Sequence, residues 1–178
     1  MVLAAALQGL LAMGLTAYLL YEGVFGVPAA SRIVAAGGAG MWLTAGYFAF
    51  IIFGPIGTAI AAGLFRQLES HMGRAPRRWQ NFLLWGALTF YNVGVVGATW
   101  LMMSAGYRGG AAAQPAMFGG LGWSAAQIHQ NIMAAYPPYI AAFMAVALLG
   151  AFLGLVGYLL VWAHPVKAPE KARPAATP

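Results

Sequence analysis

The stretch that decides the fold is residues 42–66, WLTAGYFAFIIFGPIGTAIAAGLFR. It is an almost unbroken apolar run, longer than the roughly 20 apolar residues that a helix needs to cross a bilayer. Gly54 and Pro55 interrupt the run in mid-span. Because proline lacks a backbone N–H and clashes with the preceding turn, we expect a distorted helix near the membrane centre. The distortion can serve helix packing alone, or it can make room for a cofactor or a partner helix.

The composition of the whole chain is that of an integral membrane protein. Of its 178 residues, 62% are hydrophobic and only 7% are charged, whereas a soluble domain carries about 25% charged residues. The chain has no cysteine, which excludes disulfides, thiolate metal sites and c-type haem attachment. Three histidines and three acidic residues leave few groups for acid–base or metal chemistry.

Four segments are apolar and long enough to be membrane spans. They cover about residues 2–25, 34–66, 80–104 and 131–162. The predicted fold class is therefore an all-α membrane protein, a bundle of four transmembrane helices within residues 1–166. Residues 167–178 are rich in proline, alanine and charge, which is typical of a disordered tail.

The distribution of basic residues predicts the orientation. Four arginines, from Arg66 to Arg78, lie between the second and third spans, and residues 167–178 add two lysines and an arginine. The other side carries only Arg32 and Arg108. The positive-inside rule then places both termini in the cytoplasm, as expected for a multi-pass protein of the bacterial inner membrane. The net charge of +6 does not indicate nucleic acid, because the basic residues fall in short segments between spans.

The histidines are weak candidates for haem ligands. His71 lies in the basic loop, His129 just before the fourth span on the outer side, and His164 at the cytoplasmic end of that span. His71 and His129 are expected on opposite sides of the membrane, so they cannot share one metal. Solvated histidines at the membrane interface are the simpler interpretation; a single interfacial haem ligand is the alternative.

Other polar and small residues are candidates for helix contacts. Asn92 lies inside the third span, where a buried amide usually bonds to a neighbouring helix. Gly150 and Gly154 form a GxxxG pair, which favours close helix packing. Glu22, at the outer end of the first span, is expected to be an interfacial anion that pairs with Arg32; a role in proton transfer is the alternative.

The second span also carries a local pattern of its own. Leu43-Thr44-Ala45-Gly46 is followed by Tyr47 and Ala49, and then by Phe53-Gly54 and Gly57. The pattern resembles a helix in the catalytic subunits of nitric oxide reductases and cytochrome-cbb type haem–copper oxidases. There, a stretch of the form L-T-x-x-H-x-H precedes F-G-x-x-G, and its two histidines bind haem. In this chain Tyr47 and Ala49 stand at the ligand positions.

Further segments of the same resemblance follow in order. They are residues 22–26 (EGVFG), residues 73–85 and residues 133–139 (MAAYPPY). The resemblance covers most of the chain and aligns it with the last four helices of those subunits. Because the histidines are missing, it implies no catalytic residues here, and it leaves haem b or quinone as cofactors only at an interface with another subunit.

The leading hypothesis is a non-catalytic membrane subunit of a bacterial respiratory or electron-transfer complex. It would scaffold or stabilise a catalytic subunit and would contact other membrane subunits and lipid. One alternative is a membrane subunit of an oxidoreductase that binds haem b or quinone. Another is a small transporter, whose pathway would have to use the few polar residues in the spans: Thr44, Thr58, Thr89, Asn92 and Thr99.

Overall fold

The computed structural model describes residues 1–163, and all regular structure in that range is helical. Four helical segments are long and apolar enough to cross a membrane, which confirms the all-α, four-span prediction. His164 and the predicted tail lie outside the described residues. The elements are α1 (Val2–Phe25), α2 (Ala30–Ala35), α3 (Gly40–Ile51), the π-helix η1 (Ile52–Ile56), α4 (Gly57–Ser70), α5 (Arg78–Ala113), the 3-10 helix η2 (Ala116–Phe118), α6 (Ala125–Asn131), the 3-10 helix η3 (Met133–Ala135) and α7 (Pro137–Trp162).

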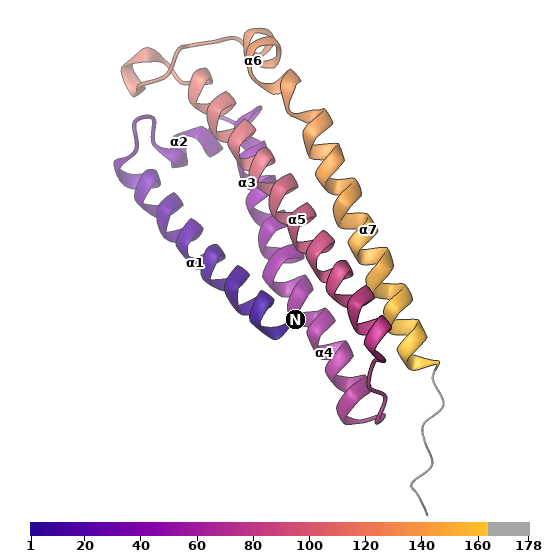
Figure 1. Ribbon diagram of the computed structural model, residues 1–178. Helices are drawn as coiled ribbons and strands as arrows, with labels where there is room; N and C mark the ends of the chain where they lie inside the picture. The colour runs from indigo at the N-terminus through magenta and orange to yellow at the C-terminus, as the bar shows by residue number, and fades with distance from the viewer. Residues whose placement is uncertain (164–178) are drawn as a thin grey trace, which may run out of the picture.

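Helix α5 is the centre of the bundle. It packs against α7 on one side and against α3 on the other, while α1 contacts η1, α2 and α4. Figure 1 shows α1 and α7 on opposite flanks, with α1 leaning away from the other helices. The 36 residues of α5 extend over about 54 Å at a rise of 1.5 Å per residue. The helix is therefore longer than the roughly 30 Å hydrocarbon core of a bilayer.

The second span is divided rather than continuous from residue 34. Gly37 and Gly38 adopt positive φ angles of 69° and 54°, a conformation that glycine adopts without steric cost. They separate α2 from α3, so the span begins at Gly40. Pro55 lies within the π-helix η1, and the chain continues as helix α4 to Ser70. A π turn is a recognised cause of local distortion in a helix, so the proline is accommodated without ending the span.

Helix α5 runs on to Ala113, beyond the expected end near residue 104. The predicted span leaves out these glycine-rich final turns, which have poor intrinsic helix propensity. Packing explains the difference. A Cβ atom at Gly106 would lie 2.0 Å from the Leu43 backbone nitrogen, and one at Gly110 would lie 2.5 Å from Ile33 Cγ2. These glycines allow α3 and α2 to approach α5 closely.

The connection from α5 to α7 is a folded cap. It contains η2, α6 and η3, and α7 begins at Pro137 rather than near residue 131. Ser124 caps α6 by accepting a hydrogen bond from the Gln127 backbone N–H, a common way to satisfy free donors at a helix start. Ala105, Ala112, Ile128 and Met133 form an apolar cluster beneath this cap.

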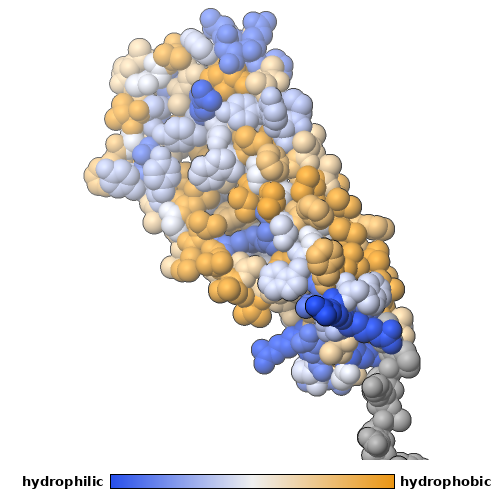
Figure 2. Space-filling model, in the orientation of Figure 1, coloured by the Kyte–Doolittle hydropathy of each residue, from blue (hydrophilic) through white to orange (hydrophobic). Residues whose placement is uncertain are grey.

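The surface agrees with a membrane-spanning bundle. On the face in view, Figure 2 shows apolar residues over much of the middle of the bundle, with a small hydrophilic patch among them, and hydrophilic residues gathered toward the two ends. We call the end that contains the α4–α5 loop the basic end, because it carries Arg66, Arg74, Arg77 and Arg78. Met1 lines a cavity with Arg66 there, and the Arg74 guanidinium lies 5.8 Å from the Trp162 ring. The starts of α1 and α5 and the ends of α4 and α7 therefore share this end.

Candidate functional site

The two described histidines lie at opposite ends of the bundle. His71 is the C-cap of α4 at the basic end, and His129 lies in the last turn of α6 in the cap. Both are exposed. They cannot ligate one metal together, which agrees with the expectation from the sequence. Among residues 1–163, no group of three or more histidine, cysteine, aspartate or glutamate side chains is placed to hold a metal ion.

The position that resembles a haem ligand instead joins two helices. The Tyr47 hydroxyl lies 2.8 Å from Thr16 Oγ1 of α1, within hydrogen-bonding distance. Thr16 also donates to the Ala12 carbonyl at 2.6 Å. One residue earlier, Gly46 faces α5, where a Cβ atom would lie 2.8 Å from the Met103 backbone nitrogen. This part of α3 thus contacts α1 through Tyr47 and α5 through Gly46.

A buried polar cluster connects α1, α4 and α5. It consists of Gln8, Thr58 and Asn92, and we call it the polar core cluster. Gln8 Nε2 donates to Asn92 Oδ1, Thr58 Oγ1 lies 3.3 Å from the same oxygen, and Asn92 Nδ2 donates to the Leu88 carbonyl at 2.6 Å. Gln8 is 5% exposed and Thr58 is 1% exposed. The Asn92 amide therefore bonds across helices, as a polar group in an apolar environment should.

Gln8 was missed by the sequence interpretation, although it is the only strongly polar side chain in the first half of α1. Gly54, in the π-helix η1 just before α4, leaves room for the Gln8 side chain. A Cβ atom at Gly54 would lie 3.0 Å from Gln8 Oε1, so a larger residue would crowd the amide. In the same π-helix, η1, the Phe53 carbonyl accepts a hydrogen bond of 2.8 Å from the Tyr91 hydroxyl.

Glu22 is paired with a tyrosine rather than with Arg32. The Tyr107 hydroxyl donates to Glu22 Oε2 at 2.9 Å, which joins α1 and α5 near the end of the bundle that carries the cap. The Arg32 guanidinium lies over the Phe118 ring, 3.9 Å from its centroid, and no described ion pair joins it to Glu22. The predicted Glu22–Arg32 pair is therefore absent from the structure.

The two glycines of the GxxxG pair have different surroundings. A Cβ atom at Gly150 would lie 2.2 Å from the Tyr91 backbone nitrogen, whereas one at Gly154 would have only Ala87 Cβ nearby, at 3.9 Å. Gly94 on α5 meets α7 in the same manner as Gly150, at 2.2 Å from the Ala147 backbone nitrogen. Close packing is thus used within the chain, between α5 and α7.

Two of the remaining polar residues considered for a transport pathway, Thr89 and Thr99, bond within their own helix. Thr89 donates to the Trp85 carbonyl and Thr99 to the Val95 carbonyl, both in α5. Such a bond leaves no donor for a neighbouring helix. Thr44 lines an apolar groove between α1 and α3.

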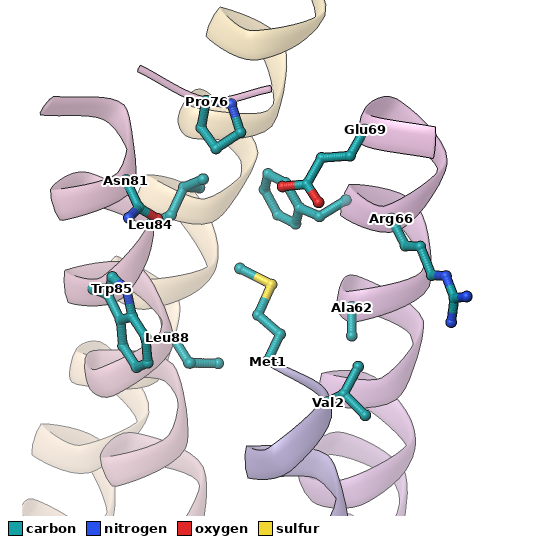
Figure 3. Close-up of a pocket in the computed structure, with 11 residues that line it drawn as sticks. Met1, Val2, Ala62, Arg66, Glu69, Pro76, Asn81, Leu84, Trp85 and Leu88 are labelled. Carbon is teal, nitrogen blue, oxygen red and sulfur yellow. The ribbon is translucent and has the colours of Figure 1, made fainter. Parts of the chain in front are cut away.

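A cavity of about 400 Å³ opens at the basic end between α1, α4 and α5. Figure 3 shows the Met1 side chain in its middle, the Glu69 carboxylate turned into it, and Asn81 and Trp85 on the opposite wall. Its volume is within the range of about 300–1,000 Å³ that small-molecule sites occupy. We call it the basic-end cavity. Sequence interpretation did not find it, because its walls come from three segments far apart in the chain.

Comparison with known proteins gives no match to a family model, to a curated protein or to a solved structure.

Proposed function

We propose that this chain is a non-catalytic membrane subunit of a respiratory or electron-transfer complex, of the haem–copper oxidase or nitric oxide reductase type. Its role is to scaffold or stabilise the catalytic subunit. The proposal combines the resemblance of the second span with what the residues of that span do here.

The observation that carries the proposal is the contact between Tyr47 and Thr16. Tyr47 occupies a position at which the resembled helices have a haem-ligating histidine, and its hydroxyl lies 2.8 Å from Thr16 Oγ1. A phenol that holds two helices together serves architecture. The polar core cluster works in the same way, because Gln8, Thr58 and Asn92 bond to one another.

The outer surface of α1 offers a place for partner helices. An apolar groove lies between α1 and α5, where Leu11, Tyr18 and Trp100 are among its lining residues. A second groove between α1 and α3 is lined by Leu19, Val24 and Phe48. Both flank a helix that buries only Gln8 and Ala12 fully. Transmembrane helices associate through such packing surfaces in lipid.

Purification of the tagged chain from its native membranes in a mild detergent tests the proposal. We expect a haem-bearing catalytic subunit to co-purify in a fixed ratio, identified by mass spectrometry and by the reduced-minus-oxidised spectrum of the complex. We expect the chain separated from its partners to show no haem absorbance.

A matched pair of variants sharpens the test. Tyr47→Phe removes the hydroxyl that contacts α1, whereas Tyr139→Phe removes a hydroxyl on an exposed side chain of α7. We expect Tyr47→Phe to reduce recovery of the complex and Tyr139→Phe to leave it unchanged. A chain that purifies without partners from native membranes contradicts the proposal. Haem bound to the isolated chain would favour the haem-binding alternative instead.

A further inference from the structure

The basic-end cavity has two charged groups with no partner. Glu69 and Arg66 are both exposed residues of α4 that line it. Neither side chain has a described hydrogen bond or ion pair, with each other or with another residue. Figure 3 shows the Glu69 carboxylate turned into the cavity and the Arg66 guanidinium on its flank, turned away. The Glu69 carboxylate is therefore free to accept charge-assisted hydrogen bonds from a cationic group held in the cavity.

The lining groups change from polar to apolar along the bundle axis. Glu69 is nearest the basic end, Arg66 lies one helical turn deeper, and Ala62 lies a further turn deeper. Residues three apart in a helix differ by about 4.5 Å along the axis and lie on neighbouring parts of its surface. Deeper still, Val2 and Leu88 form apolar walls. From the basic end inward, α4 thus offers an anion, then a cation whose guanidinium is turned outward in this structure, and then hydrocarbon.

This order is complementary to one class of membrane lipid. We propose that the basic-end cavity binds a phospholipid with a phosphoethanolamine headgroup. The primary ammonium, outermost in the lipid, donates hydrogen bonds to the Glu69 carboxylate. The phosphate, one turn deeper, is neutralised by Arg66, whose exposed and unpaired side chain can turn toward the mouth of the cavity. The acyl chains follow the walls formed by Val2 and Leu88 into the bilayer.

The charges of the site favour this lipid over its two common relatives. A phosphocholine headgroup has the same charges, but its trimethylammonium group has no N–H to donate to Glu69. A phosphoglycerol headgroup would also place its phosphate near Arg66, but it would leave the Glu69 carboxylate without a cationic partner. Charge-assisted hydrogen bonds are stronger than neutral ones, so the ammonium supplies the selectivity. The inference rests on membrane insertion and does not depend on the proposed respiratory partner.

Titration of the delipidated full-length chain with defined lipids tests the proposal. Phosphatidylethanolamine, phosphatidylcholine and phosphatidylglycerol of the same acyl chains are added in detergent, and bound lipid is counted by native mass spectrometry. We expect one tightly bound phosphatidylethanolamine, with an affinity about tenfold above that of phosphatidylcholine, which corresponds to about 1.4 kcal/mol. Water-soluble phosphoethanolamine should not compete, because the acyl chains supply most of the contact.

Variants separate the two polar contacts. Glu69→Gln should abolish the preference for phosphatidylethanolamine over phosphatidylcholine. Arg66→Gln should lower the affinity for both lipids by a similar factor. Both residues are exposed, so neither change should prevent folding. Glu22→Gln makes the same substitution at the other end of the bundle and should leave the preference intact. Equal affinity for the three lipids, or a preference that survives Glu69→Gln, would overturn the proposal, as would competition by free phosphoethanolamine.

Discussion

Helices α1 and α7 are both apolar membrane spans on the flanks of the bundle, yet they are attached in different ways. Helix α7 meets α5 through small residues that bring the two backbones together, at Gly150 against Tyr91 and at Gly94 against Ala147. Helix α1 buries only two residues fully. It is connected to the bundle by the hydrogen bonds of Gln8, Thr16 and Glu22.

The difference shows two ways of holding a helix in lipid. Apolar surface gives little net drive for association there, because lipid chains are as apolar as the helix surface. Close packing spreads the attraction along the whole α5–α7 contact. Hydrogen bonds concentrate the attraction at three levels of α1. Apolar contacts of Ala12, Leu15 and Leu19 add to them, and the rest of the helix surface is largely exposed. We therefore expect α7 to be sensitive to the size of its residues and α1 to be sensitive to their polarity.

The largest expected effect is at Gly150. In Gly150→Ala the new methyl group would meet the Tyr91 backbone nitrogen at 2.2 Å and the Ala87 carbonyl at 2.8 Å, so the two backbones must separate. Overpacking of this kind costs about 1–3 kcal/mol. The free energy of unfolding in mixed micelles with SDS measures it.

Gly154→Ala is the matched control, because it lies in the same helix and gains the same helix propensity. Its methyl group would have only ordinary contact with Ala87 Cβ at 3.9 Å, and we expect it to be neutral or stabilising. Equal destabilisation by the two alanines would show that backbone contact does not hold α7.

The next largest effect is expected in the polar core cluster. Gln8→Met keeps a similar side-chain length but removes the donor to Asn92 Oδ1 and the acceptor beside Thr58. Interhelical hydrogen bonds in membranes are worth about 0.6–2 kcal/mol. We expect a loss of stability in that range and a longer distance between spin labels on α1 and α5.

Thr89→Val is the comparison for that variant, since its hydroxyl bonds to the Trp85 carbonyl of its own helix. It should change neither the label distance nor, beyond a few tenths of a kcal/mol, the stability. Because the chain has no cysteine of its own, the two spin labels attach only to cysteines introduced for this purpose. An unchanged label distance in Gln8→Met would mean that other contacts hold α1.

A smaller effect is expected for the contact between α1 and α3. Thr16→Val and Tyr47→Phe each remove one hydroxyl of a pair 2.8 Å apart. In a double-mutant cycle, we expect a coupling energy of about 0.5–1 kcal/mol between them. A coupling energy of zero would show that Tyr47 stabilises the bundle through its ring rather than through its hydroxyl.

The smallest effect is expected at the end of α1 that lies farther from the basic end. Glu22→Gln retains an acceptor for the Tyr107 hydroxyl and removes only the charge from the bond. We expect a loss of a few tenths of a kcal/mol, since polar contacts near the membrane surface are partly replaced by water. Tyr107→Phe should cost somewhat more, because it removes the bond. If Glu22→Gln lowers the free energy of unfolding as much as Gln8→Met does, the strength of the three contacts of α1 does not depend on their depth in the membrane.

The sequence predicts the number and type of the spans, because a long apolar run in lipid has one stable backbone arrangement. It does not predict the exact limits of the helices. The turns that contain Gly106 and Gly110 have poor helix propensity, and close packing against α3 and α2 offsets it. Propensity is a weak guide wherever tertiary packing decides.

The buried contacts were predictable in part. Asn92 could be identified as a residue that bonds between helices, since an amide in mid-span needs a partner. Its partner Gln8 lies 84 residues away in sequence, and nothing in a single sequence connects the two. For the same reason the basic-end cavity, whose walls come from α1, α4 and α5, became visible only with the fold.

The π-helix at Ile52–Ile56 has a consequence for changes in chain length. A π turn contains one residue more than an α turn, and each residue of an α-helix rotates the chain by about 100°. Deletion of one residue from this segment would therefore close the wide turn to a regular α turn that spans about the same rotation, so α4 would keep its orientation relative to α3. Thr58, at the start of α4, would still face Gln8 and Asn92. Deletion of one residue from the regular α-helix on either side would instead rotate the two ends of the span against each other by about 100°, so the π-helix is the place where this span can lose a residue and keep its contacts.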